Sequence, residues 1–277
     1  MRIKMKFSIV TVSFNQARYL EETIRSVIEQ DYPDIEYIVV DPGSTDGSRD
    51  IIERYRHKIS KTVFKPDKGA ADGLNNGFSE ATGEIYGFVN SDDLLLPGAL
   101  TQVARYFESD PTLEILSGHA RIIDPDGKRI RDSYTDKFNE RAFVYGGVNI
   151  CQMSTFFRAD LIRRSTGFNV SNRVAWDAEF FVNLLRLTNK YVVVDAILSA
   201  FRVHANAITG GGTMTEQQRV FLRTLFEHIM GRPWSRRDDF IRFYYLARKY
   251  VLEPRSLVQR ILHGSIYGRY SSTRSRR

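Results

Sequence analysis

Residues 35–47 have the sequence IEYIVVDPGSTDG, an apolar β-branched run followed at once by a dense set of turn-forming residues. The run predicts a buried strand, and the residues after it predict a loop at the carboxyl end of that strand. Residues 7–15, FSIVTVSFN, repeat this order, and residues 85–93, IYGFVNSDD, repeat it with two adjacent carboxylates. Three strands therefore end in polar side chains, at the edge where open parallel sheets bind their ligands.

Helical sequence separates these strands. After the first strand, Leu20, Ile24 and Val27 recur at helical spacing, and Asn15 stands where an N-terminal cap is expected. Strand and helix alternate four times over about 110 residues, which is typical of right-handed βαβ units on a parallel sheet. The sequence therefore predicts an α/β fold with a mostly parallel central sheet.

The rhythm changes after Leu113. The rest of the body is expected to contain extended segments, one helix and a closing strand, at residues 115–123, 155–157, 179–187 and 191–194. The glycine run Gly210–Gly212 predicts the end of the body. We therefore expect a domain of residues 1–212 and a helical C-terminal extension of residues 213–277, with its last residues disordered.

The net charge of +7 is concentrated in the extension. Residues 215–277 contain 14 Arg or Lys against 5 Asp or Glu, whereas residues 1–214 contain 26 against 28. Over residues 232–262 the cations alternate with aromatic and aliphatic residues, which is typical of helices in the interface of an anionic membrane. The alternative is an extension that packs on the body and exposes a basic face. No nucleic-acid-binding module accompanies the charge, so we expect no nucleic acid as a partner.

Two features predict the compartment. Cys151 is the single cysteine, which excludes an internal disulfide, and its apolar surroundings predict a buried, inert thiol. The sequence has no apolar run of about 18 residues, and its N-terminus lacks a signal-peptide core. We expect a cytoplasmic protein, located at the inner face of the cytoplasmic membrane if the extension binds lipid.

Asp92 and Asp93 require a specific explanation. Two adjacent carboxylates repel each other at a partly buried strand end unless a cation neutralises them. Mg²⁺ or Mn²⁺ prefers oxygen ligands, supplies that charge and can bridge a diphosphate. The alternative is that the pair caps the helix expected to begin near Pro97. The sequence has no Gly-x-Gly-x-x-Gly and no Walker lysine loop, which argues against a dinucleotide or P-loop site.

Four segments, in this order, closely resemble family 2 glycosyltransferases with the GT-A fold, and the resemblance covers roughly residues 6–205. It implies a first half, residues 1–110, that binds a nucleotide-sugar donor, and a second half, residues 111–212, that binds the acceptor. It also implies inverting transfer assisted by a divalent metal. The four segments are FSIVTVSFNQ at 7–16, IEYIVVDPGSTDG at 35–47, KGAADGLNNG at 68–77 and ATGEIYGFVNSDD at 81–93.

The resemblance implies roles for individual residues. Asp93 matches a metal ligand, and Asp92 matches a residue that contacts the ribose or the metal. Many relatives carry a second Asp directly after the position of Asp41, where it contacts the base; Pro42 stands there in this chain, which leaves the nucleotide open. Asp41 has the alternative role of holding its turn through side-chain hydrogen bonds. The implied donor contacts are Thr11, Ser13, Phe14 and Asp41 around the nucleotide, and Asp67, Lys68 and Asp72 near the base, the ribose or the donor sugar.

The segment Trp176-Asp177-Ala178-Glu179 resembles the acidic motif that supplies the catalytic base in this family, with Asp177 at the position of the base. A carboxylate with an ordinary pKa of about 3.9 is sufficient when the acceptor hydroxyl becomes more acidic during bond formation. The alternative is that Asp177 caps its own helix and interacts with the helix dipole.

His204 follows the last strand of the body. Several relatives place a histidine at comparable spacing in the metal shell, so His204 joins Asp92 and Asp93 as a candidate metal ligand. Arg202, two residues earlier, is expected to pair with phosphate or to form a surface ion pair.

The sequence thus predicts an inverting glycosyltransferase. It would move a sugar from a nucleotide-diphosphate donor to a hydroxyl of a glycan or lipid-linked glycan, in the biosynthesis of an envelope polysaccharide or glycoconjugate. A catalytically silent nucleotide-sugar-binding or membrane scaffold subunit is one alternative, and the joint presence of Asp93, Asp177 and His204 argues against it. A nucleotidyltransferase is another, and residues 11–16 lack the glycine- and basic-rich triphosphate loop that it would need. The sugar, the linkage and the oligomeric state are not predicted.

Overall fold

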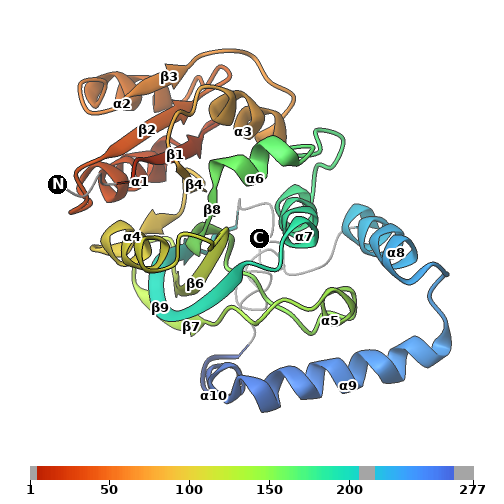
Figure 1. The fold of residues 1–277 in the computed structure, drawn as a ribbon. Coiled ribbons are helices and arrows are strands. Elements are labelled where there is room, and N and C mark those ends of the chain that lie inside the picture. Colours follow the sequence, from red (N-terminus) through yellow and green to blue (C-terminus); the bar gives the residue numbers. More distant parts are fainter. Residues whose placement is uncertain (1–4, 206–215, 265–277) are drawn as a thin grey trace. The chain divides into compact units, whose positions relative to one another are not determined.

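A computed structural model describes residues 5–205 and 216–264 of the chain (Figure 1). The chain forms two compact units, the first comprising residues 1–118 with 152–201 and the second comprising residues 119–151 with 202–277. The domain boundary predicted at Gly210–Gly212 lies outside the described residues and stays a prediction, as does the nature of the last residues. None of the helices within the described ranges has the length and apolar character needed to cross a membrane.

The first unit contains the parallel strands predicted from the N-terminal half. These strands are β1 (Phe7–Val12), β2 (Ile35–Val40), β3 (Lys61–Val63) and β4 (Ile85–Phe88). All of their pairings are parallel, and their order is β3-β2-β1-β4. Because Phe7 is in register with both Ile35 and Ile85, the carboxyl ends of β1, β2 and β4 meet at one edge of the sheet.

Beyond β4 the sheet continues with antiparallel pairs. The strands concerned are β5 (Leu94–Leu95), β6 (Ile115–Ile123), β7 (Arg129–Ser133), β8 (Thr155–Arg158) and β9 (Tyr191–Arg202). β8 pairs with β4 and β6, β9 pairs with β5, and β7 pairs with the second half of β6. The predicted α/β class is confirmed. β5 and β7 were not predicted, because a two-residue strand and a largely charged strand carry no hydrophobic period.

Helices cover both faces of this sheet. Those of the first unit are α1 (Ala17–Ile28), α2 (Ser48–Arg54), α3 (Ala70–Ser79), α4 (Ala99–Ser109), α6 (Ala159–Arg164) and α7 (Trp176–Leu187), with a 3₁₀ turn at Gln152–Ser154. α1, α2 and α4 bury apolar side chains in one core with Phe7, Ile9 and Val39. α3 packs on the opposite face, where a Cβ at Gly77 would stand 2.5 Å from Val10 Cγ1. Glycine therefore permits the close approach of α3 to β1.

An aromatic cluster fills this second face and joins α3, β4 and α7. The Phe88 ring contacts the rings of Phe78 at 6.3 Å, Phe180 at 6.4 Å and Trp176 at 6.0 Å between centroids. Phe168, in the loop before α7, stacks on Phe180 at 3.8 Å. The cluster fixes the start of α7 against β4, the strand that ends in the acidic pair.

The start of α1 differs from the sequence prediction. The N-cap residue is Gln16, and its side chain makes no capping hydrogen bond. Asn15 has a φ of 52° and accepts a hydrogen bond from Thr45 N at 2.9 Å instead of capping the helix. Asp46 Oδ2, from the loop after β2, accepts the first helical N–H, that of Ala17, at 2.8 Å. The prediction of Asn15 as the cap is wrong, because the capping carboxylate comes from a distant segment.

The second unit contains the helices α5 (Glu140–Val144), α8 (Glu216–Met230), α9 (Arg236–Leu252) and α10 (Pro254–His263). α5 packs with α8, and α10 packs with β7 and α9. Tyr145 lies at the centre of an aromatic cluster, with ring centroids 5.5 Å from Phe226 and Trp234 and 5.2 Å from Tyr245. Cys151 is buried as predicted, and burial raises the pKa of its thiol.

A buried carboxylate ties the start of α9 to this cluster. Asp238 accepts hydrogen bonds from Tyr145 Oη, from both terminal guanidinium nitrogens of Arg232 and from Ser235 Oγ, all at 2.7 Å. The bonds from the Arg232 guanidinium hold the pKa of Asp238 far below its usual range. The C-terminal extension is therefore packed on residues 119–151 by specific contacts.

Candidate active site

The loop after β2 is organised by Asp41, whose side chain is fully buried. Its Oδ1 atom accepts hydrogen bonds from the N–H groups of Gly43 at 2.9 Å and Ser44 at 2.8 Å, and from Arg49 Nε at 3.2 Å. These bonds hold the turn, the role that the sequence left as the alternative. Oδ2 is also buried and has no hydrogen-bond partner among the described residues. One oxygen thus holds the loop, and the other is an acceptor that still requires a donor.

The residues that end β1 differ in exposure. Ser13 is buried, and its hydroxyl has no hydrogen-bond partner within the described part of the chain. Phe14 is exposed, so its ring is accessible to a ligand such as a nucleobase. Thr11 is fully buried, and its hydroxyl accepts a hydrogen bond from Tyr37 Oη at 3.0 Å, which favours a structural role. A contact between Thr11 and a nucleotide stays a prediction.

The loop before α3 brings further carboxylates to this region. Asp67 and Asp72 each accept a backbone N–H of the loop, at 2.8 and 2.9 Å, and the side chain of Lys68 is exposed. Burial raises the pKa of Asp67; the charges of Asp72 and Asp41 raise it as well, and Arg173 lowers it. These electrostatic interactions show that the loops after β2 and β3 and the loop before α7 converge.

Asp92 and Asp93 lie in the turn between β4 and β5. Asp93 is fully buried, whereas Asp92 is partly exposed. Asp93 N donates to Asn90 O at 3.0 Å, and Thr23 Oγ1 of α1 donates to Asp93 O at 2.8 Å. α4 has Gly98 as its N-cap residue, and the side chain that accepts an N–H of its first turn is Gln30, whose Oε1 bonds Leu100 N at 3.2 Å. The alternative in which the acidic pair caps this helix is therefore wrong.

Gln152 also contacts the end of β4. Its Nε2 donates to Phe88 O at 3.4 Å, and its Oε1 accepts from Asn90 Nδ2 at 3.2 Å. Sequence reasoning missed this residue because a single polar side chain in an aperiodic segment gives no signal. Only its burial in the folded chain distinguishes it.

The acidic pair has the ligand type that Mg²⁺ and Mn²⁺ prefer, because Asp92 and Asp93 offer carboxylate oxygens. Among residues 5–205 and 216–264, no group of three or more His, Cys, Asp or Glu side chains is arranged to hold a metal ion. Oxygens of a bound diphosphate would therefore have to complete the coordination shell. His204 is buried and belongs to the second unit, so its role as a metal ligand stays a prediction.

Arg202 does not lie at the surface. Its side chain is fully buried, and its guanidinium donates to Asp124 O at 3.4 Å and Pro125 O at 3.1 Å. The expected position at the surface is therefore wrong, and pairing with a phosphate stays a prediction. Arg202 holds the turn that joins β6 to β7.

The predicted base motif contains two carboxylates in different environments. Both Glu179 oxygens accept amide N–H groups, from Asn169 at 3.0 and 3.1 Å and from Asn172 at 2.8 Å, which organises the loop before α7. Asp177 Oδ1 accepts only the N–H of Ala178, at 2.8 Å, among the hydrogen bonds of the described residues. Burial raises the pKa of Asp177 above its ordinary value. Of the two carboxylates, Asp177 is thus the one that accepts fewer hydrogen bonds and has a raised pKa.

Asp177 is not the N-cap residue of α7, but it lies in the first helical turn, where a carboxylate interacts favourably with the helix dipole. The N-cap residue is Ala175, and Asn172 Oδ1 accepts the N–H groups of Val174 and Ala175 just before the helix. The neighbour of Asp177, Trp176, packs on Phe88, five residues before Asp93 along the chain. The first turn of α7 is therefore held against the strand that delivers the acidic pair.

Sequence reasoning also missed Arg49 and Phe64. Arg49 bonds Asp41, and its guanidinium lies over the Phe64 ring at 4.6 Å from the centroid. Asp41 lies in the loop after β2 and Arg49 lies in α2, so no single element relates them and the sequence carried no signal for this pair. It fixes the loop that carries Asp41.

Comparison with known proteins is consistent across sequence and structure. The family model described as "Glycosyl transferase family 2" matches residues 8–166. An uncharacterized glycosyltransferase of Nostoc sp. is 36% identical over 134 residues, which is 47% of this chain and 41% of that relative. The poly(ribitol-phosphate) beta-N-acetylglucosaminyltransferase TarS of Staphylococcus aureus is 33% identical over 109 residues, 38% of this chain and 19% of TarS. The chain thus spans less than half the length of these two relatives.

Solved structures share the fold at lower identity. TarS residues 1–349 in complex with UDP match with a TM-score of 0.66 at 20% identity, covering 90% of this chain and 73% of that one. The mannosyltransferase PcManGT of Pyrobaculum calidifontis, in complex with GDP-Man and Mn²⁺, matches with a TM-score of 0.62 at 18% identity, covering 96% of this chain and 77% of that one. The fold of the present chain is the GT-A fold, and the chain belongs to glycosyl transferase family 2.

Proposed function

We propose that the protein is an inverting glycosyltransferase that uses a nucleotide-diphosphate sugar and has Asp177 as its catalytic base. The observation that carries this proposal is the difference between the two carboxylates of the α7 motif. Glu179 is fully engaged by amide groups, whereas Asp177 has a raised pKa and is bonded only to its own helix. A raised pKa makes a carboxylate a stronger base when it is ionised.

In the proposed reaction the Asp177 carboxylate accepts the proton of an acceptor hydroxyl. The hydroxyl oxygen forms a bond to the anomeric carbon of the donor sugar, on the side opposite to the diphosphate. The bond between the anomeric carbon and the diphosphate oxygen breaks, and the nucleoside diphosphate leaves with the bonding electrons. A single displacement of this kind inverts the anomeric configuration and needs no covalent enzyme intermediate.

Asp41 and Ser13 are proposed to bind the nucleotide, with Phe14 stacking on its base. A buried carboxylate oxygen without a partner accepts hydrogen bonds only, so Asp41 Oδ2 suits a base that presents an N–H group. Uracil, thymine and guanine have such an edge. TarS binds UDP and PcManGT binds GDP-Man, so relatives with this fold use both kinds of base. Asp67, Lys68 and Asp72 are proposed to contact the base, the ribose or the donor sugar.

Asp92 and Asp93 are proposed to hold a divalent cation, Mn²⁺ or Mg²⁺, with oxygens of the donor diphosphate as the further ligands; a contribution from His204 rests on the family resemblance alone. Carboxylate and phosphate oxygens form an acceptable ligand set for these ions. When bound, the cation would neutralise the donor diphosphate and stabilise it as a leaving group. The backbone of Asp93 is held by hydrogen bonds with Asn90 and Thr23, which support such a site.

The proposed acceptor is a hydroxyl of a glycan or lipid-linked glycan of an envelope polysaccharide. The name of TarS supports this class, because it describes transfer of N-acetylglucosamine to a poly(ribitol-phosphate). The identity between TarS and this chain is confined to 38% of the chain, so the sugar and the linkage are separate questions.

The first experiment is a thermal-shift screen of the full chain with uridine, thymidine and guanosine diphosphates, with and without Mn²⁺. We expect one nucleotide to stabilise the protein more strongly when Mn²⁺ is present. The matching nucleotide sugar should then release its nucleoside diphosphate only when a glycan acceptor is added. Release of pyrophosphate would instead identify a nucleotidyltransferase, and binding without release over the whole acceptor panel would identify a silent subunit.

A further inference from the structure

Helix α10 packs on its own unit with its polar side. Ser256 is buried, and Gln259 Oε1 accepts a hydrogen bond from Asp132 N of β7 at 3.2 Å. The opposite side of the helix is aliphatic and lies in solvent, with side chains that are between 39% and 73% exposed. A helix that packs on a core normally turns its apolar side inward, and α10 has the reverse orientation. The exposed side chains are Leu257, Val258, Ile261 and Leu262.

Helix α9 has an outward apolar stripe of the same kind. Phe240, Phe243, Tyr244 and Val251 are between 60% and 80% exposed, and their spacing places them on one side of the helix. The inward side is fixed, because Asp238 is buried there and the Tyr245 ring stacks on Tyr145. The helix is therefore packed on its unit through one side, and the apolar stripe is its solvent-exposed side.

Arginines accompany both stripes. Residues 232–264 contain eight Arg or Lys against three Asp or Glu. Among the ion pairs of the described residues, none involves Arg236, Arg237, Arg242 or Arg248, and all four side chains are exposed. The surface therefore combines apolar side chains with uncompensated positive charge.

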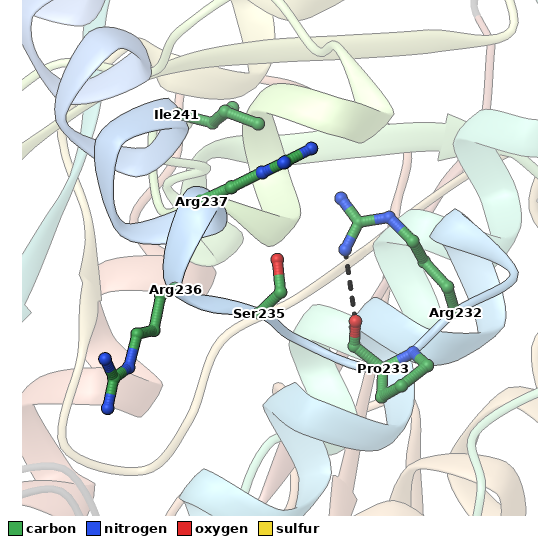
Figure 2. Close-up of a pocket in the computed structure, with 6 residues that line it drawn as sticks. All are labelled: Arg232, Pro233, Ser235, Arg236, Arg237 and Ile241. Atoms are coloured by element: carbon green, nitrogen blue, oxygen red, sulfur yellow. Dashed lines mark hydrogen bonds between the residues drawn. The ribbon is translucent and has the colours of Figure 1, made fainter.

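A cavity of about 600 Å³ lies at the start of α9 and adds to the basic character of this region (Figure 2). In Figure 2, Arg236 and Arg237 point in different directions from successive positions of the helix. The cavity is lined by Arg232, Pro233, Ser235, Arg236, Arg237 and Ile241.

We propose that the outer sides of α9 and α10 bind the interface of an anionic lipid bilayer. The aromatic and aliphatic side chains would enter the headgroup region, while the arginines would lie beside lipid phosphates. Charge complementarity favours this partner over a second copy of the chain, because a second copy would bring the same arginines together. The α9 stripe follows a helix about 25 Å long, which suits an extended surface. The proposal does not depend on the function proposed for the first unit.

The test is co-sedimentation of the full chain with vesicles of phosphatidylcholine alone or mixed with phosphatidylglycerol. We expect binding to the mixed vesicles, weakened by salt, and little binding to the neutral ones. Phe240→Ser with Phe243→Ser, or Ile261→Ser with Leu262→Ser, should lower the partition coefficient about tenfold or more. Arg242→Gln with Arg248→Gln should lower it by a similar factor, on anionic vesicles only.

The matched control is Tyr106→Ser with Leu187→Ser, which removes two exposed apolar side chains from the first unit. It should leave vesicle binding unchanged. Since all substituted side chains are exposed, each variant should keep the wild-type melting temperature, which circular dichroism checks. Equal partition of the wild type onto both vesicle types, or α9 and α10 variants that bind like the wild type, would overturn the proposal. So would sedimentation analysis in which these variants dissociate a wild-type dimer without changing vesicle binding.

Discussion

The two units of this protein depart from the usual distribution of side chains in opposite directions. In the first unit, carboxylates are buried at the ends of strands, as at Asp41 and Asp93, or half-buried at the start of a helix, as at Asp177. In the second unit, large apolar side chains such as Phe243 and Ile261 lie in solvent on well-packed helices. Both arrangements cost free energy in the isolated protein. Each arrangement fits the ligand proposed for it, a polar nucleotide sugar in the first unit and a lipid surface in the second.

Among these carboxylates, we expect the largest effect from Asp177→Asn. An amide cannot accept the proton of the acceptor hydroxyl, so turnover should fall about 10²- to 10⁴-fold, while donor binding stays nearly unchanged. Release of nucleoside diphosphate and nucleotide titration measure the two quantities. Glu179→Gln is the matched control, since an amide oxygen can still accept from Asn169, and it should lower turnover by less than about tenfold. If Asp177→Asn kept wild-type turnover, Asp177 would not be the catalytic base.

The pH dependence of turnover tests the same residue. Asp177 must be ionised to act as a base, and burial raises its pKa above the ordinary value of about 3.9. Turnover should therefore be complete at neutral pH and decline as the pH falls through this raised pKa, earlier than an exposed aspartate would require. A pH profile of turnover at saturating donor measures it. A profile that stays flat down to the pKa of an ordinary aspartate would contradict the assignment.

A smaller effect is expected from Asp41→Asn. The amide can still hold the loop with its oxygen, but its NH₂ group replaces the acceptor Oδ2 with a donor. Donor affinity should fall about ten- to hundredfold, as measured by nucleotide titration. Asp46→Asn is the control from the same loop, because Asp46 caps α1, and it should lower the melting temperature with little change in affinity. Equal affinity losses in the two variants would indicate a general loosening of the loop.

Glu36 tests the effect of a buried carboxylate on stability. It is buried, and although burial alone would raise its pKa, hydrogen bonds from Ser8 and Thr82 and the charge of Lys6 lower the pKa to about 2. The stabilisation is complete above the unfolded pKa of about 4.3 and is lost as the pH falls towards 2. Glu36→Gln should thus lower the free energy of unfolding by about 2–3 kcal/mol at neutral pH, and by little near pH 2. Denaturant unfolding over this pH range measures it, with the exposed Glu29→Gln as an unaffected control.

The smallest effect is expected at the outer stripe of α9. Phe243→Ser should change the free energy of unfolding by less than about 0.5 kcal/mol, because the side chain is already in solvent. Phe226→Ala, in the buried cluster of the same unit, should cost about 3–5 kcal/mol. Chemical denaturation of both variants measures the contrast. A large loss in Phe243→Ser would mean that the stripe is part of the protein core and would weaken its comparison with the first unit.

The sequence predicted those parts of the fold that local patterns determine. β1, β2 and β4 followed from apolar runs with polar ends, and α1 and α3 followed from apolar residues at helical spacing. β5 and β7 are defined by their pairing with β9 and β6, so no local sequence pattern indicated them. In the same way, the amphipathic character of α10 was readable, but the side that faces the protein was not. That choice depends on Asp132 and its partner Gln259, which are far apart in sequence.

The candidate site shows the same division. Asp41 and Asp177 were predicted from motif positions, whereas the contribution of Asn172, which binds the backbone just before α7, was not. The division of labour between the two oxygens of Asp41 was not predictable, because it depends on how the loop folds around one of them. Gln152 and Arg49 bond Asn90 and Asp41, respectively, but no pattern in the sequence links either residue to its partner.

The capping of α1 has a consequence for the order of folding. The N–H groups of Gln16 and Ala17 are bonded by Ser48 Oγ and Asp46 Oδ2, which follow them by about 30 residues in the chain. A nascent chain that ends before β2 therefore lacks the groups that complete the first turn of α1, and that turn should fray. The helix becomes complete only when β2 joins β1 and delivers its loop. We therefore expect the pairing of β1 with β2 and the completion of the first turn of α1 to be coupled, because the loop after β2 supplies both acceptors.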